Sequence, residues 1–103
     1  MNINDNQPVI KIALNQIPKN SFQICENVIV VNLDDNFYAV ENTCSHQKIP
    51  LNPSEIVNSE EFECAKHGAR FNIKSGMPTC LPAVKPIKTY TTKIEDGLIL
   101  VFE

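Results

Sequence analysis

Cys44-Ser-His46 and Cys64-Ala-Lys-His67 are two short stretches that contain both histidines of the chain and two of its four cysteines. The seventeen residues 47–63 separate the two stretches. As hairpin turns, each would offer one thiolate and one imidazole to the same point in space. Four such ligands can hold a zinc ion or, divided between two irons, a histidine-ligated [2Fe–2S] cluster. Cys44, His46, Cys64 and His67 are therefore candidate metal ligands.

The sequence around these stretches has the pattern of β-strands. Residues 9–14 alternate, with Ile10, Ile12 and Leu14 on one face, and residues 28–33 are rich in β-branched side chains. Asp96-Gly97 lies between two apolar runs, which is a strong hairpin signal, and Asp34-Asp-Asn36 indicates a second hairpin turn. We expect strands at residues 9–14, 28–33, 37–41, 61–64, 69–72, 87–94 and 98–102.

The rest of the pattern gives little support to helices. The seven prolines fall between the expected strands, where a missing N–H breaks no ladder hydrogen bond. No window has helical periodicity over more than about two turns, and residues 52–57 are expected to form a short helical turn at most. The sequence thus predicts an all-β fold: one small domain, residues 1–103, of stacked antiparallel sheets with two Cys-His hairpin loops.

Size and composition limit the class of protein. A chain of 103 residues is one small domain, and 43% apolar and 20% charged residues are ordinary for a globular protein. No apolar run approaches the roughly 20 residues needed to cross a bilayer, and the polar start lacks the parts of a signal peptide. We therefore expect a cytoplasmic protein with no membrane partner.

The net charge bears on the kind of partner, and the remaining cysteines bear on disulfide formation. A net charge of −3 with scattered lysines and arginines argues against a nucleic-acid partner, because binding a polyanion needs a basic stripe. In a reducing compartment, thiols tend to be metal ligands or buried apolar groups rather than disulfides. Cys25 and Cys80 have no histidine nearby and lie in apolar stretches, so we expect both to be buried small hydrophobes.

The order of the candidate ligands bears on the choice between zinc and iron. Two cysteines and two histidines make a sufficient tetrahedral zinc site, which small domains use to compensate for a thin core. Zinc fingers, however, usually pair cysteine with cysteine and histidine with histidine. Here each stretch mixes the two types, which would place two thiolates on one iron and two imidazoles on the other. A zinc-stabilised binding module stays open as the less favoured alternative.

The chain from 10 to 101 resembles the soluble Rieske-type ferredoxins of multicomponent ring-hydroxylating oxygenases. The resemblance rests on Cys44-x-His46, on Cys64-x-x-His67-Gly68, and on the stretches that follow them: Ala69-Arg-Phe71-Asn, Ser75-Gly76, residues 81–90 and residues 97–101. It implies a Rieske-like domain that binds one [2Fe–2S] cluster. The implied cluster-binding loops are 43–50 and 64–71, with Cys44, His46, Cys64 and His67 as ligands.

The resemblance also implies a function. Such a protein is a one-electron carrier, not an enzyme, and passes electrons from a flavin-dependent ferredoxin reductase to a terminal oxygenase, as a monomer. Both histidines are used by the cluster, so none is left for the mononuclear iron at which Rieske oxygenases activate O₂. The alternative is a Rieske-like small subunit of a larger reductase, such as assimilatory nitrite reductase.

Departures from the family pattern indicate a low reduction potential. High-potential Rieske proteins carry a disulfide-bonded cysteine in each cluster loop, and the matching positions here are Ile49 and Lys66. Those proteins also place a serine and a tyrosine near the cluster sulfurs, where this chain has Ala69 and Phe71. Fewer hydrogen bonds to the sulfurs leave the reduced cluster less stabilised. The resemblance further predicts that Gly68 lets the backbone approach the cluster, and that residues 47–50 and Pro82 wall it.

Overall fold

The computed structural model describes residues 7–45, 49–66, 68–80 and 85–103. They form ten strands and one 3-10 helix of three residues, and no helix in these ranges is long and apolar enough to cross a membrane. The elements are β1 (Ile10–Ala13), η1 (Leu14–Gln16), β2 (Ser21–Cys25), β3 (Val28–Leu33), β4 (Asn36–Glu41), β5 (Ile56–Val57), β6 (Glu61–Glu63), β7 (Arg70–Asn72), β8 (Pro78–Cys80), β9 (Thr89–Glu95) and β10 (Leu98–Phe102).

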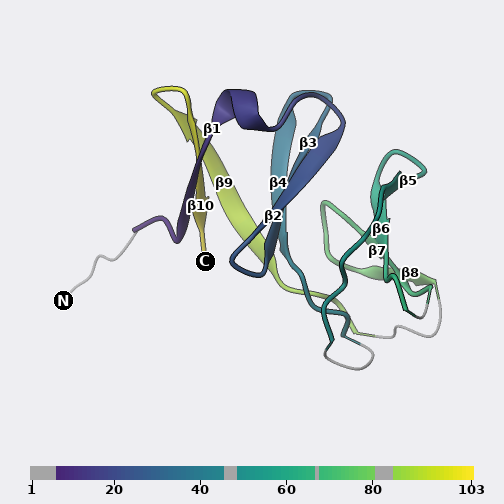
Figure 1. The fold of residues 1–103 in the computed structure, drawn as a ribbon. Helices are drawn as coiled ribbons and strands as arrows, with labels where there is room; N and C mark the ends of the chain where they lie inside the picture. The colour runs from purple at the N-terminus through teal and green to yellow at the C-terminus, as the bar shows by residue number, and fades with distance from the viewer. Residues whose placement is uncertain (1–6, 46–48, 67, 81–84) are drawn as a thin grey trace.

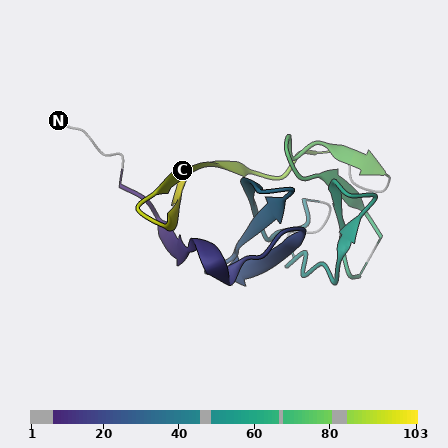
Figure 2. The ribbon, with the colours of Figure 1, turned by 90° about the horizontal axis from the view of Figure 1, so that it is seen from above.

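The strands pair into two antiparallel sheets (Figure 1). The large sheet has six strands in the order β1-β10-β9-β4-β3-β2, and the small sheet has four in the order β5-β6-β7-β8. The large sheet is curved, and the small sheet lies to one side of it (Figure 2). The predicted all-β fold of antiparallel sheets is confirmed.

Strand β3 separates two hydrophobic cores, because all six of its residues are buried. Side chains alternate along a strand, so its odd and even positions enter different cores. The large-sheet core contains Ile10, Ile12, Ile17, Val28, Val30, Ala39, Ile99 and Val101. The inter-sheet core contains Ile29, Val31, Leu33, Val40, Cys44, Leu51, Phe62, Cys64, Ala69, Phe71, Ile73 and Ile87. The second of these cores includes one cysteine from each predicted ligand stretch.

Two-residue turns fix the register of the large sheet. Asp34 and Asp35 connect β3 to β4 with φ of 56° and 70°, and Asp96 and Gly97 connect β9 to β10 with φ of 52° and 76°. Two successive positive φ values are typical of the type I′ turn, whose twist matches that of paired strands. Both predicted hairpins are confirmed.

The structure corrects several details of the predicted elements. Residues 52–57 end in strand β5 rather than in a helical turn, because β5 pairs with β6. Pro78 does not lie between strands but begins β8, an edge strand, where a missing N–H is tolerated. Strand β9 begins at Thr89 instead of at residue 87. Strand β2 is not among the predicted strands, although its sequence, SFQIC, alternates between polar and apolar side chains from Ser21 to Ile24.

The prediction that Cys25 is buried is wrong. Cys25 is half-buried at the end of β2 and packs against the large-sheet core from its edge. Because β2 is an edge strand, no further strand among the described residues pairs with its outer side. For Cys80 the structure describes the backbone in β8, and the burial of its side chain stays a prediction.

Candidate functional site

Two loops of similar construction carry the predicted cysteine ligands. The first loop follows β4, and in it the Cys44 N–H donates a hydrogen bond to the carbonyl of Ile49 over 2.6 Å. The second loop connects β6 to β7, and in it the Cys64 N–H donates to the carbonyl of Ala69 over 2.7 Å. In each loop a cysteine is thus joined to the residue five positions later. Each cysteine therefore lies at the base of a short hairpin, as the sequence predicts.

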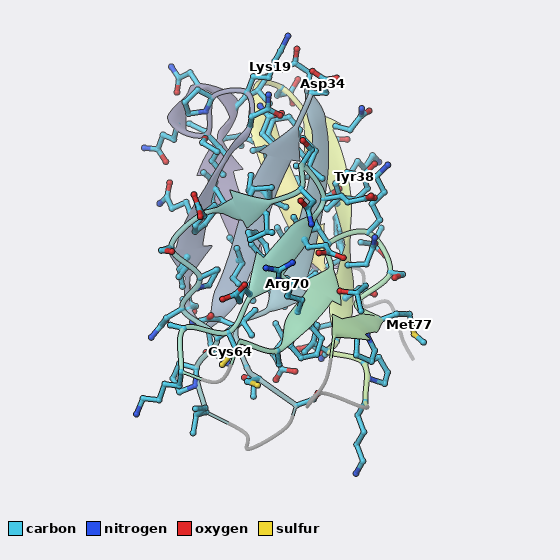
Figure 3. The ribbon with its side chains drawn as sticks, turned by 90° about the vertical axis from the view of Figure 1, so that its right-hand side faces the viewer. Lys19, Asp34, Tyr38, Cys64, Arg70 and Met77 are labelled. Carbon is cyan, nitrogen blue, oxygen red and sulfur yellow. The ribbon has the colours of Figure 1, made fainter. Side chains whose placement is uncertain are left out.

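Both cysteine side chains are buried in the inter-sheet core. Cys44 is 0% exposed and Cys64 is 1% exposed, and both belong to the same cluster of packed residues. Figure 3 shows Cys64 at the end of the molecule opposite Lys19 and Asp34. The structure thus brings together two thiols that are twenty positions apart in the sequence. Thiolates are the ligands that iron–sulfur clusters require from cysteine.

Backbone hydrogen bonds connect the two loops. Leu51, which follows the first loop, donates from its N–H to the carbonyl of Asn42 over 3.3 Å. The Leu51 carbonyl accepts from the N–H of Ala65, next to Cys64, over 3.1 Å. Since Leu51 is fully buried, this connection is shielded from water. The position of the second loop is therefore tied to that of the first.

Gly68 makes a further backbone hydrogen bond inside the second loop. Its N–H donates to the carbonyl of Cys64 over 3.1 Å, and its φ is 73°. A Cβ at Gly68 would meet no described atom within 4 Å, so the backbone conformation, not crowding by the protein, favours glycine here. The closer approach to a cluster expected for this glycine stays a prediction.

A third segment reaches the first loop at Ser45. The Ser45 hydroxyl donates to the carbonyl of Lys85 over 2.6 Å, although forty positions separate the two residues. The Glu41 N–H, at the end of β4, donates to the Lys88 carbonyl over 2.8 Å. The chain after residues 81–84 therefore runs along the first loop. Pro82, predicted to wall the cluster, lies outside the described residues.

Two of the described ion pairs lie on segments that adjoin the loops. Glu63 and Arg70 form an ion pair of 2.9 Å across β6 and β7. The ion pair of Lys88 with Glu103, at 3.2 Å, raises the pKa of Lys88. Burial raises the pKa of Tyr90, whose ring centroid lies 5.0 Å from the Lys88 nitrogen. Each of these two ion pairs thus combines one positive and one negative charge on a segment that adjoins a loop.

Half of the predicted ligand set lies among the described residues. Cys44 and Cys64 are brought together, whereas His46 and His67, like the predicted wall residues 47 and 48, lie outside them. Ile49 is described, and it packs against the inter-sheet core. The residues that join the loops are not among the predicted site residues: Asn42, Ser45, Leu51 and Asn52. The one available signal is the abundance of asparagine beside the first loop, and it does not reveal the pairing.

Comparison with known proteins defines the class to which this arrangement belongs. The chain belongs to the Rieske [2Fe-2S] domain family, whose model matches residues 8–91. The ferredoxin subunit of 3-phenylpropionate/cinnamic acid dioxygenase from Photorhabdus laumondii is 32% identical over 75 residues, which cover 73% of this chain and 71% of the relative.

Solved structures show the same similarity. The ferredoxin of carbazole 1,9a-dioxygenase from Nocardioides aromaticivorans IC177 has a TM-score of 0.84 and 32% identity, covering 93% of this chain and 97% of that one. A chain from a complex of reduced oxygenase and oxidized ferredoxin in carbazole 1,9a-dioxygenase has a TM-score of 0.77 and 25% identity, with 87% of each chain covered.

Family membership confirms the predicted cofactor and role. The cofactor is one Rieske-type [2Fe–2S] cluster, and the protein is an electron carrier of the ferredoxin type rather than a catalyst. The described residues fit this cofactor, because two buried thiols lie at the bases of two connected loops. A cluster that needs two thiolates on one iron requires such a placement.

Proposed function

We propose that this protein carries single electrons from a flavin-dependent ferredoxin reductase to a terminal oxygenase, by means of a cluster held by Cys44, His46, Cys64 and His67. The observation that carries the proposal is the placement of Cys44 and Cys64, buried together on two loops of similar construction. We assign the cluster to loops 43–50 and 64–71 of a single domain spanning residues 1–103.

The sequence positions of the histidines support the rest of the ligand set. His46 lies within the first loop, between Cys44 and Ile49, and His67 lies within the second, between Cys64 and Ala69. Each loop therefore supplies one thiolate and one imidazole. When bound, a cluster with this ligation takes up and returns one electron. Cys44 and Cys64 provide the two negative charges of the ligand set, and the neutral imidazoles add none.

The named relatives support the choice of partners. They are ferredoxin subunits of dioxygenases, and one structural neighbour comes from a complex of an oxygenase with its ferredoxin. We infer that this chain likewise delivers electrons to a terminal oxygenase, as a monomeric cytoplasmic carrier that binds neither nucleic acid nor membrane. Contacts between such carriers and their partners are brief and lie at the small end of the interface size range.

Electron paramagnetic resonance of the dithionite-reduced protein tests the ligand set. We expect a rhombic signal whose average g value lies below that of clusters with four cysteine ligands. Replacing His46 or His67 by cysteine should move the average g value towards that of all-cysteine clusters, where a cluster is retained. A colourless protein that contains stoichiometric zinc would contradict the proposal and favour the zinc-stabilised module.

The partner assignment has its own test. Purified carrier should restore electron flow from NADH through a dioxygenase reductase to its oxygenase, measured as product formed per electron. It should also elute as a monomer. Isolation in a stable complex with a large reductase would favour the alternative of a permanent nitrite-reductase-type subunit.

A further inference from the structure

Two asparagines close the first cluster loop at its base. The Asn42 side chain donates from Nδ2 to Asn52 Oδ1 over 2.9 Å, and its Oδ1 accepts from the backbone N–H of Asn52 over 2.8 Å. Asn42 is only 4% exposed, so both ends of a nearly buried amide are paired with one residue. The two asparagines flank residues 43–51, which contain the predicted ligands of this loop.

The pair is also fixed to the large sheet. The Asn42 N–H donates over 2.8 Å to the carbonyl of Asn27, in the turn between β2 and β3. The Asn27 side chain in turn donates to the hydroxyl of Thr43 over 3.2 Å. At the other end of the loop, Asn52 has a φ of 39°, a conformation that asparagine tolerates better than most residues. Asparagine at position 52 therefore supplies both the backbone conformation and the partner amide.

The same pair positions the second loop through Leu51. This residue directly precedes Asn52, and its N–H donates to the Asn42 carbonyl. Its own carbonyl accepts the N–H of Ala65, the residue after Cys64. A displacement of Asn52 relative to Asn42 would therefore disturb the two backbone hydrogen bonds of Leu51 that connect the first loop to the residue after Cys64.

We propose that Asn42 and Asn52 form a clamp that positions the two cluster loops and sets how fast the cluster is lost. This inference rests on the proposed ligand set, and both asparagines are positioning residues whose described side-chain hydrogen bonds join them to each other. Loss of a cluster held by two loops requires one loop to move away from the other. Local opening of this kind costs less free energy when the hydrogen bonds at the base of a loop are removed.

The test compares the asparagine variants with a matched control. Asn42→Ala removes both side-chain hydrogen bonds, and Asn52→Gly keeps the positive φ but removes the partner amide. Asn58→Gly is the control, because Asn58 also has a positive φ, of 51°, and is exposed in the turn between β5 and β6. Cluster loss in excess EDTA is followed by visible absorption.

We expect the half-time of cluster loss to shorten about fivefold or more in Asn42→Ala. Asn52→Gly should act in the same direction, and the double variant should lose its cluster no faster than Asn42→Ala alone, because Asn42→Ala already removes both hydrogen bonds of the pair. Asn58→Gly should match the wild type. Unchanged half-times in Asn42→Ala and Asn52→Gly would overturn the clamp.

A general loss of stability has to be separated from loss of positioning. Val30→Ala opens a cavity in the large-sheet core, away from the inter-sheet core that contains Cys44 and Cys64. It should lower the unfolding temperature without the faster cluster loss of the clamp variants. Cluster loss that simply follows the unfolding temperature in every variant, Val30→Ala included, would overturn the clamp.

The clamp and the proposed function fail in different ways. A wild-type protein without the signal of a histidine-ligated cluster would overturn the ligand set, and the clamp with it. A normal wild-type signal together with wild-type cluster retention in the asparagine variants would overturn the clamp alone.

Discussion

Glu63 and Arg70 are paired across β6 and β7, with Arg70 Nε 2.9 Å from Glu63 Oε1. Glu63 directly precedes Cys64, and Arg70 directly follows Ala69, so the pair borders the hydrogen bond that closes the second cluster loop. Figure 3 shows Arg70 on the small sheet, above Cys64. Opposite charges are thus held together beside the proposed site, where each affects the energy of an added electron.

Changing one member of this pair should shift the midpoint potential. Reduction adds one negative charge, so Glu63→Gln should raise the potential and Arg70→Gln should lower it. Both side chains are more than one third exposed, so solvent screens them and each shift should be on the order of 20–60 mV. A redox titration of both variants measures the shifts. Lys93→Gln, in the exposed pair of Lys93 with Glu95 on β9, is a control that should shift the potential less. Shifts of the same sign in Glu63→Gln and Arg70→Gln would contradict this account.

The residues at positions 69 and 71 predict a low potential. Ala69 and Phe71 are fully buried in the inter-sheet core with both cysteines, and neither side chain can donate a hydrogen bond. We therefore expect a midpoint potential between about −150 and 0 mV, the low end of the Rieske range. Ala69→Ser and Phe71→Tyr should each raise it, because a hydroxyl near a cluster sulfur stabilises the reduced state. A clearly positive wild-type value in a redox titration would refute the prediction.

Tyr90 and Lys88 predict that stability falls in alkaline solution. Burial raises the pKa of Tyr90, and the ion pair with Glu103 raises that of Lys88. The folded state then holds these protons more tightly than the unfolded state, so the free energy of unfolding decreases as the pH rises through about 10. Urea unfolding at a series of pH values measures this slope. In Tyr90→Phe the decrease should be smaller, and an identical slope would show that Tyr90 contributes nothing.

The sequence predicts most strands whose apolar pattern is local, with β2 as the exception, and misses β5 and β8, which depend on pairing. Strand β3 is apolar except at Asn32 and lies at its predicted position, 28–33. Strand β5 has only two residues, and its place in the small sheet depends on pairing with β6. The same limit applies to the site. Cys44 and Cys64 are recognisable from their spacing to histidine, but the pairing of Asn42 with Asn52 depends on how the first loop closes.

Gly76 has a role that its position in the sequence does not reveal. It has a φ of 76°, and its carbonyl accepts the N–H of Ile87 over 2.9 Å. A Cβ at this position would collide with the Ile87 carbonyl oxygen, which is a backbone atom and has little freedom to move. Ile87 is buried in the inter-sheet core, so this contact joins the turn before β8 to the segment before β9. Gly76 therefore connects the small sheet to the segment that reaches the first cluster loop at Lys85.

Gly76→Ala should for this reason destabilise the protein much more than Gly97→Ala. Both glycines have a φ of 76°, so both substitutions force alanine into the left-handed region at a cost of about 1–2 kcal/mol. At Gly97, however, a Cβ would meet no described atom within 4 Å. The additional collision at Gly76 should add about 1–3 kcal/mol. Urea unfolding of the holoprotein measures both losses, and the difference between them isolates the collision. Equal losses in the two variants would mean that the Ile87 segment moves aside freely, and Gly76 would then be needed only for its backbone conformation.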